Sequence, residues 1–174
     1  MKETTEELIA VASQQGFDMM LSNGRIYHSA ILAIQGDSVA ENISQIQKCL
    51  ASHTILQLDS VLPLWLYLLA KAYDHNGQHL QALDTLNHAL DFESVKILRS
   101  DLLILKGKAL LNQQEEAAEN CFQQAYQVAR EQYAKAVQLR AAINLAQLWQ
   151  KQGKRPQARD LLAPLYEWFT AGFA

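Results

Sequence analysis

The amino-acid sequence predicts an all-α protein built from consecutive antiparallel helix hairpins. Hydrophobic residues make up 49% of the 174 residues and charged residues 19%, a balance that supplies enough apolar surface for a folded core. Only three prolines and seven glycines interrupt the chain, and Ala, Leu and Gln, which favour helices, are abundant. No stretch alternates apolar and polar residues over the length of a strand, so we expect essentially no strand.

Turn residues and apolar spacing delimit the first five helices. The ranges expected for them are about 4–15, 17–35, 38 to beyond 50, 60–75 and 79–91. The first two end at glycines, and the third follows Asp37 and Ser38 as capping residues. The fourth begins near Ser60 with Pro63 in its first turn, and it stops at the turn containing Gly77, which readily takes the left-handed conformation.

Four further helices follow the same logic. Their expected ranges are about 95–111, 115–132, 134–152 and 156–169. The sixth ends at the polar run "NQQ", the eighth ends at Gly153, and the ninth places Pro156 in its first turn. Each carries apolar residues at helical spacing, which predicts one buried face per helix.

One residue pattern recurs along these helices. A small residue, a large residue, a turn residue, and then small, large and small or large residues follow in order: Ala70–Tyr73–Gly77–Ala82–Leu86–Ala89, Gly107–Leu110–Gln114–Ala118–Phe122–Ala125 and Ala146–Trp149–Gly153–Ala158–Leu162–Leu165, with a blurred copy at Ser29–Leu32–Gly36. Small residues let two antiparallel helices approach, and large ones fill the space beside the contact. One hairpin cannot bury its own face, so neighbouring hairpins must stack.

This pattern resembles the tetratricopeptide repeat (TPR) over nearly the whole chain. The resemblance implies a right-handed superhelical stack, a TPR-like α-solenoid of about four hairpins in a single domain, 1–174, with helix 4–15 as an N-terminal cap or half repeat. The segment Ala118–Ala174 is similar to the C-terminal TPR region of large bacterial signal-transduction ATPases and adenylate-cyclase-type regulators, through "LRAAINLAQLWQKQGKR", "A..LLAPLYEWFT" and "GF". The chain is thus expected to be the sensor or interaction tail of such a regulator.

The resemblance also implies a binding surface. In TPR proteins the first helix of each hairpin lines a concave groove, and the matching positions here are Leu64, Tyr67, Lys71, Asp74, Asp101, Ile104, Lys108, Arg140, Ile143, Asn144 and Gln147. Apolar residues mixed with cations suit an extended peptide or helix that carries carboxylates. Chaperone-binding TPRs place Lys and Asn where Tyr67 and Lys71 stand here, which argues against a chaperone tail as the ligand.

The sequence offers no catalytic motif. A phosphate-binding GxxxxGK[ST] motif is missing, and Cys49 and Cys121 lie in helical patterns that indicate buried structural thiols. His79, Asp84 and His88 are of metal-ligand type, but exposed polar residues around a turn are the favoured interpretation. We therefore expect a protein that is not an enzyme and that uses neither a cofactor nor a metal.

Charge and hydropathy restrict the partners. A net charge of −3 argues against direct binding of nucleic acid. A basic cluster, Lys151, Lys154, Arg155 and Arg159, is interpreted as a solvated turn with helix-end charges. The longest apolar run, 61–70, is too short to span a bilayer, and the N-terminal sequence lacks the features of a signal peptide. A cytoplasmic location without membrane contact is expected.

Three functions remain open. A protein–protein interaction scaffold is favoured. A small-molecule sensor would need an aromatic pocket, for which Trp65, Tyr67, Tyr73 and Trp149 are available. Self-association as a homodimer would need an exposed apolar face, for which Leu64 and Trp65 are candidates.

Overall fold

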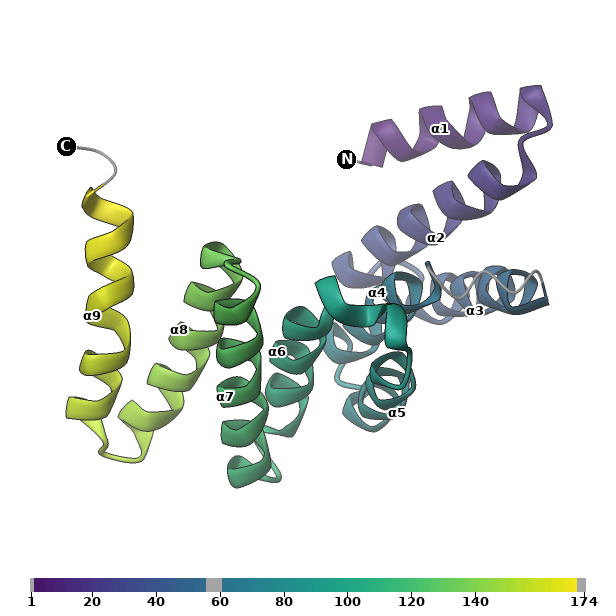
Figure 1. Cartoon of the computed structure of the whole chain (residues 1–174). Helices are drawn as coiled ribbons and strands as arrows, with labels where there is room; N and C mark the ends of the chain where they lie inside the picture. Colours follow the sequence, from purple (N-terminus) through teal and green to yellow (C-terminus); the bar gives the residue numbers. More distant parts are fainter. Residues whose placement is uncertain (1, 56–60, 172–174) are drawn as a thin grey trace. The chain divides into compact units, whose positions relative to one another are not determined.

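The computed structural model describes residues 2–55 and 61–171, and within these ranges the chain is all-α (Figure 1). Its helices are α1 (Lys2–Gln15), α2 (Asp18–Gln35), α3 (Val39–Ile55), α4 (Leu62–His75), α5 (His79–Leu90), a 3-10 helix η1 (Glu93–Ile97), α6 (Arg99–Leu110), α7 (Glu115–Glu131), α8 (Lys135–Lys151) and α9 (Arg155–Ala171). The described residues form no strand, so the predicted fold class is confirmed.

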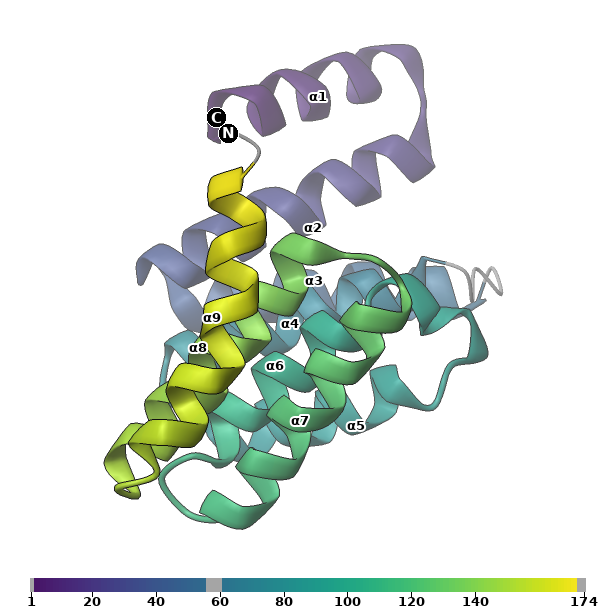
Figure 2. The same cartoon turned by 60° about the vertical axis from the view of Figure 1, so that its left-hand side comes forward.

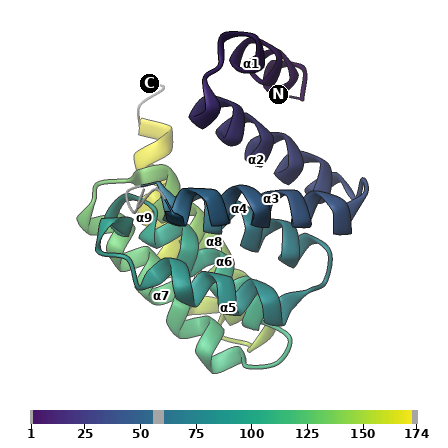
Figure 3. The same cartoon turned by 90° about the vertical axis from the view of Figure 1, so that its right-hand side faces the viewer.

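The helices group into two compact units, Met1–Val95 and Lys96–Ala174. In the first unit α1 packs on α2, α2 on α3 and α4 on α5, and α4 also packs against α2 and α3 (Figure 3). In the second unit α6 packs on α7, α7 on α8 and α8 on α9, and α8 also packs against α6 (Figure 2). Each unit thus consists of consecutive helix pairs, and the single-domain interpretation stays a prediction.

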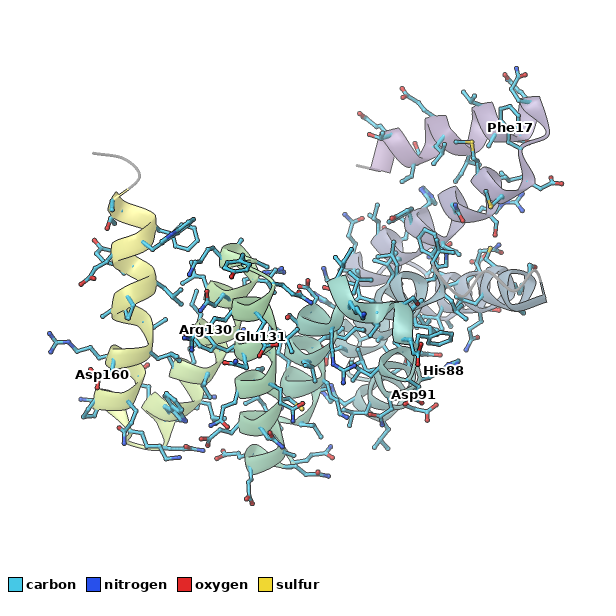
Figure 4. All side chains as sticks on the ribbon, in the orientation of Figure 1. Phe17, His88, Asp91, Arg130, Glu131 and Asp160 are labelled. Atoms are coloured by element: carbon cyan, nitrogen blue, oxygen red, sulfur yellow. The ribbon has the colours of Figure 1, made fainter. Side chains whose placement is uncertain are left out.

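Glycine makes several of the turns between helices. Gly36, Gly77 and Gly153 have φ values of 84°, 73° and 78°, a left-handed conformation that residues with a Cβ rarely adopt. The turn between α7 and α8 instead uses Tyr133 at a φ of 56°. Phe17, at the turn between α1 and α2, is exposed (Figure 4). Gly36, Gly77 and Gly153 thus lie at turns that their positions in the sequence predicted. The turn at Tyr133 falls between the expected helices 115–132 and 134–152, although no glycine or proline marks it.

One helix start differs from its expected position, and the expected N-cap of another helix lies outside the described residues. The sixth helix was expected from Val95, but Glu93–Ile97 forms a 3-10 helix and α6 begins at Arg99. Short 3-10 segments are common as connectors. This one buries Val95 alone and leaves Ile97 86% exposed, so it has no helical apolar stripe. Ser60, the expected N-cap of the fourth helix, lies outside the described residues; Pro63 does fall in the first turn of α4.

Small and large residues of the repeated pattern are buried where the helices of α4–α5 and of α6–α7 meet. Fully buried members are Ala70, Ala82, Leu86, Ala89, Ala118, Phe122 and Ala125. Gly107 lies so close to the Phe122 ring that a Cβ on it would be 2.5 Å from Cε1. In the last repeat Trp149, Ala158 and Leu162 are only half-buried.

None of the helices described is both long and apolar enough to cross a bilayer.

Candidate functional site

The predicted groove positions of the first unit all lie on α4. Leu64, Tyr67, Lys71 and Asp74 are half-buried and follow each other at three- and four-residue steps, which places them on one side of the helix. Asp74 is already engaged, because its Oδ1 lies 3.1 Å from Nδ1 of His79 across the α4–α5 turn. Lys71 forms no ion pair with any residue in the described ranges.

In the second unit two predicted groove charges neutralise each other. The Arg140 guanidinium lies 2.7 Å from Oδ1 of Asp101, so α8 and α6 are joined by an ion pair. Asn144 donates from its side chain to the Arg140 carbonyl oxygen at 2.7 Å. Ile104 is buried, with 7% of its surface exposed, whereas Lys108 is exposed. Of the predicted cations in this unit, Lys108 is thus the one without an ion pair among the described residues.

A polar cluster that the sequence did not reveal lies between α7 and the end of α8. Oε1 of Glu119 accepts a hydrogen bond of 2.8 Å from the Trp149 indole, and its Oε2 lies 3.4 Å from Nζ of Lys154. Burial acts to raise the pKa of Glu119. The hydrogen bonds from Trp149 and Lys154, with the Lys154 charge, outweigh that effect and lower the pKa below its ordinary value of 4.5.

We expect Glu119→Gln to destabilise the second unit at neutral pH by about 1 kcal/mol, because an amide keeps an acceptor for Trp149 but loses the charge that Lys154 pairs with. A lowered pKa in the folded state stabilises the fold above pH 4.5, and this contribution is lost as the pH falls through the folded-state value. Urea unfolding at pH 7, 5 and 3.5 should therefore show the two proteins converging in acid. The same difference in free energy of unfolding at all three pH values would contradict a stabilising role for the Glu119 charge.

The second unit also contains a cleft between α8 and α9, of about 410 Å³. Its lining is Ile143, Ala146, Gln147 and Gln150 from α8 with Arg155, Ala158, Arg159 and Leu162 from α9. Two predicted groove residues, Ile143 and Gln147, are thus brought together with two members of the basic cluster. The interpretation of that cluster as a solvated turn with helix-end charges agrees with the exposure of Lys151, Arg155 and Arg159. Lys154 is half-buried and in addition pairs with Glu119.

Two other clefts have charged residues in their lining. One, of about 900 Å³, lies along the first turns of α7 and includes Glu115, Glu116, Glu119 and Lys154. The other, of about 350 Å³, lies between α2 and α3 and includes Arg25 and Lys48. None of the three clefts has an aromatic ring in its lining.

The aromatic residues singled out by the sequence are engaged inside their own units. Trp65 is 3% exposed and packs edge-on against Tyr27 of α2, with ring centroids 5.0 Å apart. The Tyr73 hydroxyl accepts a hydrogen bond of 2.9 Å from the Gln47 side chain. Neighbouring helices therefore cover Trp65, and it cannot be the exposed apolar surface that self-association would need.

No catalytic arrangement emerges from these contacts. Cys49 and Cys121 are free and buried, as predicted, and burial raises the pKa of the Cys121 thiol against the opposing effect of the Lys106 charge. The described residues contain no group of three His, Cys, Asp or Glu side chains close enough to hold a metal ion. His79, considered as a ligand beside Asp84 and His88, instead contacts Asp74.

Known structures identify the architecture. The chain superposes on a crystal structure described as the nearly identical TPR-like repeats of a "putative kinesin light chain" from Podosopora anserina, with a TM-score of 0.67, and on its variant in which methionine replaces that protein's own glutamine at position 17, with a TM-score of 0.69. Both comparisons cover 95% of this chain and 83% of the other, at 18% sequence identity. This chain has a TPR-like fold. No family model matches the sequence, and no curated protein matches it.

Proposed function

We propose that this TPR-like chain is a non-catalytic scaffold that binds a protein or peptide partner through the first helices of its hairpins. The observation that carries the proposal is the state of Lys71 and Lys108. Each directly follows the small packing residue of its repeat, Ala70 or Gly107, and neither forms an ion pair among the described residues. Two cations at matching repeat positions suit a ligand with carboxylates.

The structure favours a scaffold over a small-molecule sensor. A sensor pocket is concave and largely apolar, with aromatic residues in its lining. The clefts described above lack aromatic rings, and Trp65 and Tyr73 are buried in the core of the first unit. The hydrogen-bond donor of Trp149 is occupied by Glu119. These rings are therefore placed to support packing.

The double variant Lys71→Glu and Lys108→Glu is expected to abolish partner binding and to leave helicity intact, because repulsion replaces attraction at both positions. A pull-down from lysate of the source cell, with wild type and variant side by side, measures this. Lys96→Glu and Lys151→Glu is the matched control, since both lysines are exposed and lie outside the predicted groove. Equal recovery by all three proteins would remove the groove assignment.

The finer proposal is that this scaffold serves as the interaction tail of a bacterial signalling ATPase in the cytoplasm. The similarity of Ala118–Ala174 to the repeat region of such proteins supports it. Mass spectrometry of the protein captured by wild type tests it. Capture of an ATPase, lost in the Lys71 and Lys108 variant, is the expected result, and capture of an unrelated protein class would overturn this context while leaving the scaffold function in place.

A further inference from the structure

The last two repeats of the second unit differ in how well they are covered. Ile104 and Ile143 hold the same position relative to Gly107 and Ala146, the small residues of their repeats, yet Ile104 is 7% exposed and Ile143 is 40% exposed. After the turn, Phe122 is fully buried whereas its counterpart Leu162 is half-buried. The face of the α8–α9 hairpin is therefore more open than the same face of α6–α7.

The cause of this difference is the helix that follows. The α6–α7 hairpin is covered by α8, which packs against both of its helices (Figure 2). Within the described part of the second unit, no helix takes the corresponding place on α8–α9. The cleft of about 410 Å³ lies there, with Ile143, Ala158 and Leu162 in its lining. Its position and apolar residues suit a helix that packs as α8 packs on α6–α7.

The charges on the two faces are opposite. Glu115 and Glu119 of α7 correspond, after the turn, to Arg155 and Arg159 of α9. On α7 the Glu119 carboxylate receives the indole of Trp149 and the ammonium group of Lys154, both from the end of the covering helix and the turn after it. On α9 the two matching positions are Arg155 and Arg159, which both line the α8–α9 cleft. A helix docked there in the same way would bring its C-terminal end against these two arginines.

We propose that the α8–α9 face, defined by Ile143, Ala158, Leu162, Arg155 and Arg159, binds an amphipathic helix of a separate protein partner that carries carboxylates in its last turn. The apolar side of that helix covers Ile143 and Leu162. Its carboxylates, together with the partial negative charge at a helix C-terminus, face the two arginines. The proposal deepens the proposed function, on which it rests for the partner being a protein.

The same charges disfavour a copy of α8 as the occupant. Such a helix ends with Lys151 and is followed by Lys154, so it would bring ammonium groups against Arg155 and Arg159. Like charges in close contact are repulsive, and the apolar gain would be offset. The charge of the last turn therefore decides which helix this face accepts.

Two labelled peptides test this directly with the full chain. One has the sequence of residues 135–154, and the other is identical except for glutamates in place of the lysines at 151 and 154. Fluorescence anisotropy at low salt should show the acidic peptide binding about tenfold more tightly than the basic one, since two ion pairs change sign. Raising the salt concentration should shrink this preference.

Chain variants locate the binding site. Arg155→Glu with Arg159→Glu should reverse the peptide preference, and Ile143→Ala should weaken both peptides without changing it. Arg99→Glu with Arg130→Glu is the control, because both arginines are exposed on α6 and α7, away from the cleft, and the net charge change is equal. Circular dichroism verifies that each variant keeps its helices.

Three results would overturn the proposal: no binding of either peptide, equal binding of both, or an unchanged preference in the Arg155 and Arg159 variant. A wild-type dimer that becomes a monomer in that variant, measured by light scattering, would replace the separate partner with a second copy. Failure of the proposed function shows itself elsewhere, as equal pull-down by wild type and by the Lys71 and Lys108 variant. The two failures are therefore distinguishable.

Discussion

Phe122→Ala is expected to destabilise the second unit by about 3–5 kcal/mol, the usual cost of deleting a fully buried aromatic side chain. The Phe122 side chain is fully buried, and its ring lies directly over the Gly107 backbone of the facing helix. Truncation leaves a cavity that glycine cannot fill, because glycine has no side chain to move into it.

Urea unfolding followed by circular dichroism measures this loss as a lower midpoint with an unchanged slope. Tyr166→Ala is the matched control, since Tyr166 is an aromatic residue of α9 that is 71% exposed. It should change the free energy of unfolding by no more than about 0.5 kcal/mol. A loss of less than about 1 kcal/mol for Phe122→Ala would show that the ring does not fill the α6–α7 contact.

Gly107→Ala is expected to destabilise the same unit, although alanine favours helices. The added Cβ would lie 2.5 Å from Cε1 and 2.8 Å from Cδ1 of Phe122, so the ring must move. Overpacking of this kind costs about 1–3 kcal/mol, while the gain in helix propensity is about 0.5–1 kcal/mol. Urea unfolding should therefore show a net loss.

The neighbouring repeat supplies the rescue. There Ala146 stands in place of Gly107 and Leu162 in place of Phe122. The larger residue at the first position is thus matched by a smaller one at the second. The double variant Gly107→Ala and Phe122→Leu should lose less free energy of unfolding than the two single variants lose in sum. The difference, which is the coupling energy, should be about 0.5–3 kcal/mol. Additive losses would show that the two positions do not pack against each other.

The local structure of this chain could be predicted from its sequence because the signals are local. Glycine at 36, 77 and 153 marks turns that need a left-handed φ, and apolar spacing marks the helices between them. The predicted start of α6 was wrong because a local signal was misleading there. Val95 is apolar and continues the spacing, but the 3-10 helix that it belongs to buries that residue alone.

The candidate site was less predictable, because it depends on which charges meet. The spacing placed Arg140 among the groove cations, but it does not reveal that Asp101 lies 2.7 Å from its guanidinium. Likewise, the role of Glu119 depends on Trp149 and Lys154, which lie 30 and 35 residues away along the chain. One sequence signal could have revealed that the α6–α7 and α8–α9 faces carry opposite charges: Glu115 and Glu119 in one repeat align with Arg155 and Arg159 in the next.

By itself, the sequence determined the all-α class, the hairpin repeat and the small residues at the helix contacts, since each of these follows from helix propensity, spacing and side-chain volume. Only the tertiary structure decided which side chains remain available to a partner. Trp65 is covered by Tyr27, Lys154 is held by Glu119, and Arg155 and Arg159 line an open cleft. Exposure and ion pairing depend on the neighbouring helix, and one-dimensional spacing does not specify where that helix lies.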